Sequence, residues 1–180
     1  MNLLVTGTPG VGKTKVAKEL SKILGLTWIN EKDFALKNKI GSFNEDNELE
    51  IPVDQLEKKA NSFLKNKKNI IFEGHVFCET KLKVDLVIVL KVSPEELESR
   101  LLSRNYSLVK VMDNVFCEGI DYCLKHAKKK FSKKKIIVIN SDNDYRITVA
   151  NCLVEIENKG CLEVKKGKKG LQMVLKPVFK

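Results

Sequence analysis

The sequence lacks the features that would place the protein in a membrane or outside the cell. No apolar run approaches the ~20 residues of a membrane-spanning helix. None of the five cysteines falls in a Cys-x-x-Cys pair, and their odd number favours reduced thiols that serve as small apolar side chains over structural zinc. The first residues already have the pattern of a strand, which leaves no room for a signal peptide. These absences predict a reduced, cytoplasmic protein without membrane contacts, or a nuclear one in a eukaryote.

Arginine is also scarce. The chain has a formal net charge of +10, yet its only arginines are Arg100, Arg104 and Arg146. The positive charge is carried by lysines, many of which gather in two clusters: Lys125, Lys128, Lys129, Lys130, Lys133, Lys134 and Lys135, and then Lys165, Lys166, Lys168 and Lys169. Such clusters can bind rRNA or the surface of a ribonucleoprotein. The alternative, which composition alone favours, is a set of solvated lysines from a lysine-rich, thermophilic proteome.

What is present is the pattern of an α/β protein. The 180 residues, 43% of them apolar and 31% charged, are enough for one globular domain with a sizeable core. Strand-like and helix-like segments alternate, which predicts a five-stranded parallel sheet with helices on both faces. The predicted strands are Asn2–Thr6, Leu26–Asn30, Asn69–Glu73, Val84–Val92 and Lys135–Asn140. Residues 160–180 leave this pattern, and their two alternating stretches predict either a β-hairpin or a disordered basic tail.

Several helices have clear sequence signals. Pro52 predicts the start of one helix, after a polar and irregular segment, residues 30–51, that is predicted to be a mobile insert. Ser93-Pro94-Glu95-Glu96 predicts another start, with Ser93 as the cap and Glu96 closing a capping box. The last helix is predicted over residues 145–158. One further helix is predicted from an apolar face made of Phe116, Ile120, Cys123, Leu124, Ala127 and Phe131.

The strongest motif is Gly7-Thr8-Pro9-Gly10-Val11-Gly12-Lys13-Thr14, which fits the phosphate-binding pattern G-x-x-x-x-G-K-[ST]. It lies between the first predicted strand and a segment with a helical apolar face. Gly10 and Gly12 let successive N–H groups turn toward phosphate oxygens, and the helix presents its positive end to the same anion. Lys13 would reach the outer phosphates, and the Thr14 hydroxyl would ligate Mg²⁺. The motif predicts binding of a nucleoside triphosphate.

Two side chains after the third predicted strand are candidates for chemistry. Glu73 ends that strand, and in a parallel sheet the carboxyl ends of the strands face the ligand crevice. Glu73 is therefore placed to hold Mg²⁺ or its water; the alternative is an ordinary surface carboxylate. His75, two residues on, could position a nucleophilic water or a phosphate, although a single histidine is more often structural or exposed.

The paired arginines are candidates for binding phosphate. Arg100 and Arg104 are four residues apart and so project from one helical face. The planar guanidinium group binds phosphate with two hydrogen bonds and keeps its charge. The alternative is a solvated helix face on which Arg100 pairs with Glu96. A GTPase is disfavoured because Asn30-Glu31-Lys32-Asp33 has the wrong order for the guanine signature Asn-Lys-x-Asp.

Several of these segments together resemble the adenylate kinase isoenzyme 6 family. The resemblance is carried by Thr6–Thr14, Ile29-Asn30, Glu73-Gly74-His75, Arg100–Tyr106 and Asp113-Asn114, and it covers residues 1–158. This family consists of small archaeal and nuclear adenylate kinases that also assist maturation of the small ribosomal subunit. The resemblance implies an adenylate kinase-like P-loop fold, reversible phosphoryl transfer from ATP to AMP, and a weaker ATPase activity. It also implies two partners, ribosomal protein uS11 and the small-subunit precursor.

The resemblance also implies roles for single residues. Residues 30–53 would form the nucleoside-monophosphate-binding lobe and residues 103–113 a short lid, in which Arg104 contacts ATP with Arg100 as its helical neighbour. Glu73 and His75 match an Asp-x-His motif that is tied to the ATPase, with Glu in place of Asp. Lys15 stands where the family usually has a threonine, so it adds a cation beside the phosphate loop. Asn105 replaces a common glycine at the lid hinge.

The predicted monophosphate-binding lobe contains no arginine, so Lys37 or Lys39 would have to meet the phosphate of AMP. The first hypothesis is a nucleoside monophosphate kinase that uses ATP and Mg²⁺. The second is a ribosome-assembly ATPase in which the kinase activity is vestigial. The third is a kinase for another small acceptor, such as shikimate. Residues 159–180 lie outside the resemblance.

Overall fold

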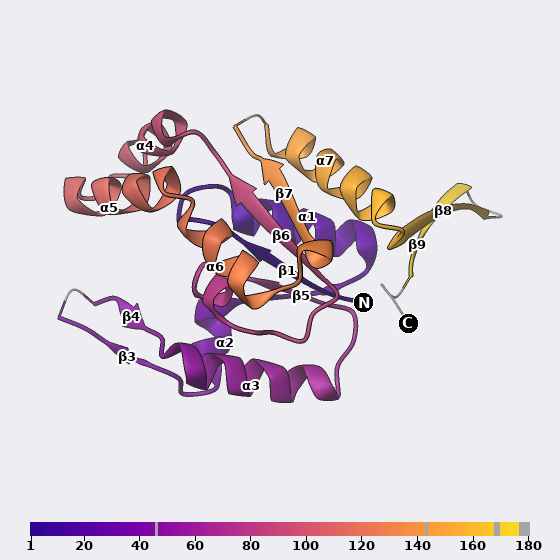
Figure 1. The fold of residues 1–180 in the computed structure, drawn as a ribbon, viewed down its shortest axis with the longest axis horizontal. Helices are drawn as coiled ribbons and strands as arrows, with labels where there is room; N and C mark the ends of the chain where they lie inside the picture. The colour runs from indigo at the N-terminus through magenta and orange to yellow at the C-terminus, as the bar shows by residue number, and fades with distance from the viewer. Residues whose placement is uncertain (46, 143, 168–169, 177–180) are drawn as a thin grey trace.

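The computed structural model describes residues 1–45, 47–142, 144–167 and 170–176. Its centre is a five-stranded parallel sheet, as the sequence predicted, and the strand order is β2-β5-β1-β6-β7 (Figure 1). The strands are β1 (Asn2–Thr6), β2 (Thr27–Asn30), β5 (Ile70–Glu73), β6 (Leu86–Lys91) and β7 (Ile136–Asn140). Val5 and Asn30 are the register partners of Glu73 on its two sides, so these three strands end together at one edge of the sheet.

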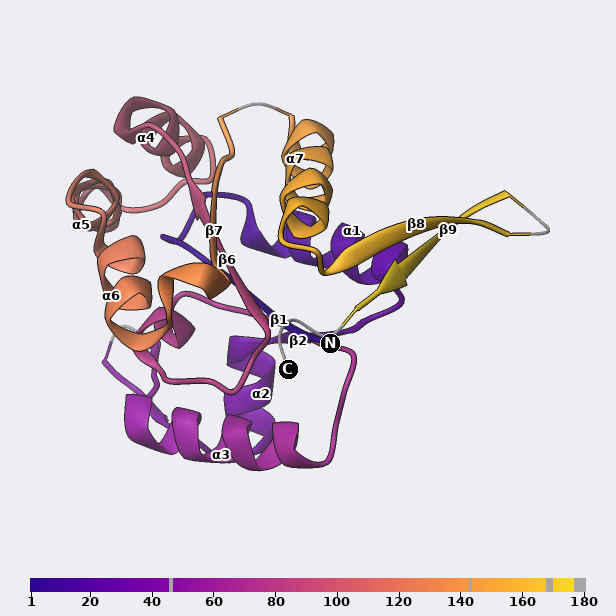
Figure 2. The same ribbon diagram turned by 45° about the vertical axis from the view of Figure 1, so that its right-hand side comes forward.

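Side chains of the central strands alternate between two cores because successive residues of a strand point to opposite faces. Leu3 and Val5 belong to one core, against α1 (Lys13–Leu24) and α7 (Tyr145–Asn158), which lie next to each other (Figure 2). Leu4 belongs to the other core, which includes side chains from α3 (Val53–Lys65), the short 3-10 helix η1 (Val76–Glu79) and α6 (Tyr122–Lys130). Both layers of helices therefore bury apolar faces against the sheet.

The predicted insert contains more regular structure than its polar sequence indicated. It forms α2 (Glu31–Lys37) and a small antiparallel pair, β3 (Ser42–Phe43) and β4 (Leu49–Glu50), before α3 begins after Pro52. The Asn30 side chain accepts a hydrogen bond from the Asp33 N–H at 3.2 Å, which caps the start of α2. Phe34, on the buried face of α2, packs edge-to-face on Phe72 of the sheet. The insert is thus attached to the core by α2.

The start of α4 (Pro94–Leu102) agrees with the prediction only in part. Ser93 caps the helix, since its hydroxyl accepts the Glu96 N–H at 3.3 Å. Glu96 does not close a capping box; its carboxylate pairs with Arg100 instead. The Ser93 N–H donates to the Asp142 carboxylate at 2.7 Å. A side chain from the loop after β7 therefore takes the place that local sequence assigned to Glu96.

The long apolar helix predicted around residues 116–131 is wrong as a single helix. The chain forms α5 (Leu108–Gly119) and α6, and between them Asp121 has a left-handed backbone with φ 58°. Leu124 and Ala127 are buried as predicted, but Phe116 is 66% exposed because α5 diverges from α6. The exposed apolar side chains of α5 are Leu108, Val109, Met112 and Phe116.

The end of the chain forms a hairpin of β8 (Leu162–Gly167) and β9 (Gly170–Leu175), which extends from the body beyond α7 (Figure 1). Of the tail lysines, Lys168 and Lys169 lie outside the described residues. The described part of residues 160–180 therefore has the predicted hairpin and not the alternative, a disordered tail. Within the part of the chain that the structure describes, no helix is both long and apolar enough to cross a membrane.

Phe72 should be the most important aromatic side chain for stability. It is fully buried, and its ring lies 5.3 Å from that of Phe34, 6.2 Å from Phe63 and 5.0 Å from Phe77. We expect Phe72→Ala to lower the free energy of unfolding by about 3–5 kcal/mol, because it leaves a cavity where α2, α3 and the sheet meet. Urea unfolding followed by circular dichroism measures the loss. Phe43→Ala, which removes a half-exposed ring, is the control and should change stability by less than about 0.5 kcal/mol. Equal losses would contradict the prediction.

Candidate active site

The phosphate loop joins the end of β1 to the start of α1. Gly10 and Gly12 have φ values of 102° and 98°, a backbone conformation that residues with a Cβ atom rarely adopt. Gly12 is the N-cap of α1 and provides no side-chain cap for the first N–H groups of the helix. These donors are available to an anion at the positive end of the helix.

Lys13 lies inside this loop. Its ammonium group donates hydrogen bonds to the carbonyl oxygens of Gly7 at 2.9 Å and Thr8 at 3.0 Å. Burial lowers the pKa of Lys13, while the negative charge of Glu73 opposes the shift. A buried ammonium held by carbonyl groups is well placed to transfer its hydrogen bonds to a phosphate that enters the loop.

The two predicted magnesium ligands meet at the end of β5. Thr14 donates from its hydroxyl to one carboxylate oxygen of Glu73 at 3.1 Å, and the Asn30 amide donates to the other at 2.9 Å. Glu73 is only 3% exposed. A hydroxyl and a buried carboxylate supply the hard oxygen donors that Mg²⁺ prefers, so the side chains present fit this metal ion. They would hold it beside Lys13 and the phosphate loop.

Sequence reasoning missed a second buried carboxylate, that of Glu31. It accepts hydrogen bonds from the backbone N–H groups of Val76 at 3.3 Å and Phe77 at 2.8 Å, and it lies 3.4 Å from Nδ1 of His75. Burial raises the pKa of Glu31 to about 7, and the two backbone hydrogen bonds oppose this rise. Desolvation, with a smaller effect of the Lys13 charge, lowers the pKa of His75. The sequence held a signal for Glu31, because it follows the last residue of β2 directly. A carboxylate at the end of a strand is also what identified Glu73, the last residue of β5.

A pocket of about 240 Å³ lies between the phosphate loop, the end of β5 and the insert. Its lining residues are Pro9, Lys13, Asn30, Glu31, Lys32, Leu49, Ile51, Glu73, Gly74 and His75. We call it the acceptor pocket, because it adjoins the position where Lys13 would meet a terminal phosphate. Lys32, from the first turn of α2, is the cation that the insert contributes to this lining.

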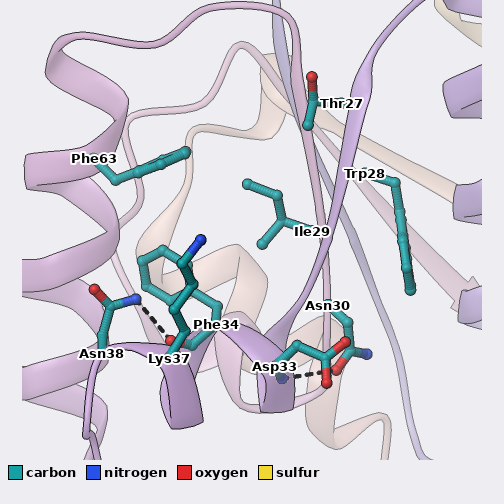
Figure 3. Close-up of a pocket in the computed structure, with 9 residues that line it drawn as sticks. All are labelled: Thr27, Trp28, Ile29, Asn30, Asp33, Phe34, Lys37, Asn38 and Phe63. Carbon is teal, nitrogen blue, oxygen red and sulfur yellow. Dashed lines mark hydrogen bonds between the residues drawn. The ribbon is translucent and has the colours of Figure 1, made fainter.

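A second cavity, of about 470 Å³, lies at the outer edge of β2 (Figure 3). Ile29, Phe34 and Phe63 give this cavity an apolar lining. At its edge, the Asn38 side-chain amide donates a hydrogen bond to the Phe34 carbonyl oxygen at 2.7 Å. Lys37 lines this cavity and not the acceptor pocket, and Lys39 lines neither. Neither of the two lysines that the sequence nominated for the AMP phosphate therefore lines the acceptor pocket, whereas Lys32 does. Which lysine binds that phosphate stays a prediction.

The two paired arginines do not line the acceptor pocket. The Nε atom of Arg100 donates to Glu96 at 2.7 Å, and its Nη2 donates to the carbonyl groups of Ser141 at 2.7 Å and Asp142 at 3.2 Å. Arg100 thus pairs with Glu96 on the face of α4, which is the alternative to phosphate binding, and it also donates hydrogen bonds to the loop after β7. Arg104 is exposed in the turn after α4, where Asn105 has φ 57°. Its predicted role in contacting ATP stays a prediction.

Lys15 lies in the first turn of α1. Its ammonium group is 5.8 Å from the centre of the Tyr145 ring at the start of α7, which is within cation–π distance. Its predicted place beside the phosphates stays a prediction.

Glu118 is a second residue that the sequence did not single out. It lies near the end of α5, is 5% exposed, and accepts hydrogen bonds from the Thr8 hydroxyl at 2.5 Å and from the Val92 N–H at 3.1 Å. At the other end of α5, Lys110 forms an ion pair with Glu48 of the insert. Residues 108–113 of the predicted lid are thus the first half of α5, and this helix contacts both the phosphate loop and the insert.

A phosphate loop after β1, a buried carboxylate after β5 and an adjoining acceptor pocket define a P-loop kinase. A family model described as "AAA domain" matches residues 3–121. Proteins named "Putative adenylate kinase" are similar to this chain: the one from Thermococcus kodakarensis is 43% identical over 127 residues, 71% of this chain and 70% of its own length. The one from Pyrococcus furiosus is 36% identical over 160 residues, 89% of this chain and 86% of its own length. The chain belongs to this family of archaeal adenylate kinase homologues.

Solved structures confirm the fold. Shikimate kinase from Bacteroides thetaiotaomicron superposes with a TM-score of 0.62 at 15% identity, over 87% of this chain and 98% of that one. Deoxyadenosine kinase from M. mycoides, with bound dATP, superposes with a TM-score of 0.55 at 19% identity, over 87% and 100%. The α/β P-loop kinase fold predicted from the sequence is therefore correct. Membership of the isoenzyme 6 group in particular stays a prediction.

Glu73→Gln tests the proposed metal side of the site. The change keeps the size of the side chain but removes the charge that would face Mg²⁺, so we expect kcat/KM for ATP turnover to fall about 10–100-fold and the Mg²⁺ requirement to rise. Initial rates measured across a Mg²⁺ titration report both effects. Glu19→Gln, on the outer part of α1, is the control and should match the wild type. An unchanged Mg²⁺ dependence in Glu73→Gln would remove Glu73 from the metal site.

Proposed function

We propose that the protein is a nucleoside monophosphate kinase that transfers a phosphoryl group from ATP to AMP and forms two molecules of ADP. The observation that carries the proposal is the acceptor pocket, which opens directly beside Lys13 and is closed on its other side by the insert. The names of the archaeal relatives support a nucleotide as acceptor. The pocket, and not the larger cavity at the edge of β2, is the second substrate site.

In this proposal the phosphates of ATP lie on Gly10, Gly12 and Lys13. Thr14 and Glu73 would hold Mg²⁺, which neutralises phosphate charge when it is bound. The acceptor is already an anionic phosphate, so no general base is needed, and positioning and charge neutralisation do most of the work. Lys13 can follow the charge of the transferred group because its ammonium lies between the loop and the acceptor pocket.

The acceptor would be bound by the insert. Leu49 and Ile51 give the pocket an apolar side for a base, and Lys32 provides the cation for the monophosphate. The Lys32 ammonium lies 5.9 Å from the centre of the Phe43 ring, within cation–π distance. Closure of the turn after α4 would bring Arg104 toward the phosphates and exclude water, and we propose this step for the lid residues 103–113.

Lys32→Ala tests the acceptor site. A lost hydrogen bond to a charged group is worth about 1.5–3 kcal/mol, so we expect the KM for AMP to rise about 10–100-fold while the KM for ATP changes little. A coupled assay for ADP with varied AMP measures both constants. Lys37→Ala, which alters the other cavity, is the control and should leave both constants unchanged.

Two results of this assay would contradict the proposal. If Lys37→Ala raised the KM for AMP and Lys32→Ala did not, the assignment of the monophosphate site would be wrong. If the wild type bound ATP but showed no AMP-dependent turnover, the kinase assignment would fail. A panel of other monophosphates and of alcohol acceptors such as shikimate would then identify the acceptor class.

His75 supports a second proposed use of the same site, which is ATP hydrolysis. The imidazole lines the acceptor pocket two residues after Glu73, where a water could take the place of the AMP phosphate. Hydrolysis of this kind could time the binding of the protein to a small-subunit precursor or to ribosomal protein uS11, and the lysine clusters could contact rRNA. A pull-down with uS11, with and without ATP, tests the partner.

His75→Ala separates the two activities. If His75 orients the attacking water, the ATPase rate without AMP should fall about 10–100-fold, and the kinase rate should fall much less, because AMP supplies its own nucleophile. Both rates are measured on the same preparation. His126→Ala is the control, since His126 stacks on Tyr122 in α6. Equal loss of both activities would exclude a role in positioning water.

A further inference from the structure

Glu31 is a buried carboxylate that contacts both the backbone and a side chain of the neighbouring loop. It begins α2, is 4% exposed, and directs its side chain away from its own helix into the loop after β5. There it accepts the N–H groups of Val76 and Phe77. Gly74 packs so closely on it that a Cβ at position 74 would overlap the Glu31 carboxylate. An apolar side chain would leave both N–H groups without this acceptor, so the carboxylate caps η1, but the cap alone does not require a contact with His75.

The third contact of Glu31 is with His75. One carboxylate oxygen lies 3.4 Å from Nδ1 of the imidazole, and both residues line the acceptor pocket. A carboxylate beside Nδ1 favours the tautomer with its proton on Nδ1, which leaves Nε2 as a hydrogen-bond acceptor. The His75 side chain is 54% exposed, so without this contact little else would orient it.

Glu73, the other carboxylate in the lining of the acceptor pocket, cannot take this role, because its partners are different. Both oxygens of Glu73 receive hydrogen bonds, from Thr14 and from Asn30. The two acids are thus divided between the two sides of the pocket. Glu73 faces the phosphate loop, and Glu31 faces the loop that carries His75.

We propose that Glu31 is a positioning residue that holds His75 with Nδ1–H toward its carboxylate and Nε2 toward the acceptor pocket, where Nε2 accepts a hydrogen bond from the attacking water. This inference rests on the proposed hydrolytic use of the site. It makes Glu31 a determinant of the ratio between hydrolysis and phosphoryl transfer, because the AMP phosphate needs no such orientation.

Nitrogen NMR of the histidines tests the orientation directly. The chain has two histidines, so His126→Ala leaves the His75 signals alone in protein labelled with ¹⁵N-histidine. We expect the Nδ1–H tautomer in this background. Glu31→Leu removes the acceptor, and the ring should return to the Nε2–H tautomer that free histidine prefers. Glu31→Gln, which keeps the size of the side chain, provides a second variant if Glu31→Leu does not fold. Its one remaining oxygen would be taken by the Phe77 N–H, so the same change is expected.

Activities measured on the same variants separate positioning from a general effect on the loop. We expect the ATPase rate of Glu31→Gln to fall about 10-fold or more, and the ratio of the ATPase rate to the kinase kcat to fall with it. Adding His75→Ala should cause no further loss of hydrolysis, since the two residues act as one unit. The matched control is Glu79→Gln, which should change neither rate. Glu79 is a carboxylate in η1 that accepts a hydrogen bond from the Tyr122 hydroxyl.

The possible failures are distinct. An Nε2–H tautomer in the His126→Ala background, or a tautomer that does not change in the Glu31 variants, would overturn the positioning role. Parallel loss of both activities, additive with His75→Ala, would overturn it in favour of a structural cap for η1. A wild type without ATPase activity, in which the tautomer still depends on Glu31, would overturn only the hydrolytic use of His75.

Discussion

The architecture of the site depends on the buried carboxylate of Glu73. A buried charge must be satisfied by donors, and Glu73 has one donor from Thr14, at the start of α1, and one from Asn30, at the end of β2. In the sheet, Asn30 and Val5 flank Glu73 in register, so the backbone places these donors within reach. One side chain therefore connects the phosphate loop, the central strands and the start of the insert.

Two further buried carboxylates extend this pattern around the phosphate loop. Glu118 joins α5 to Thr8 and to the end of β6, and Glu31 joins α2 to the loop that carries His75. The chain has a net charge of +10, and among its described residues Lys13 carries the only buried ammonium group, on which the negative charges of Glu73 and Glu31 act. Each of the buried acids links two segments that are distant in sequence, so the position of the insert and of α5 relative to the phosphates is set by specific polar contacts.

These links explain which parts of the site could be predicted. Lys13, Thr14 and Glu73 were identified because a local pattern, a glycine-rich loop or the end of a strand, dictates their position. Glu118 was missed because nothing near it in the sequence indicates that its partners are Thr8 and Val92. Lys37 and Lys39 were chosen by composition, since the insert has no arginine, and only the fold shows that Lys32 is the lysine of the insert that lines the pocket. Arg100 was ambiguous in the sequence, and its bonds to Glu96 and to the loop after β7 depend on how α4 packs.

The sequence by itself determined the fold class, the succession of strands and most helices along the chain, and the phosphate loop. These features follow from hydrophobic periodicity and glycine placement, which are local signals. It could not determine the break between α5 and α6, where one left-handed residue turns an apparently continuous apolar face in two directions. The tertiary structure decided which acids are buried, which lysine of the insert lines the acceptor pocket and which carboxylate lies beside His75. The physical reason is that a buried charge is stable only beside its partners, and in this chain those partners come from strands and helices that only the folded sheet brings together.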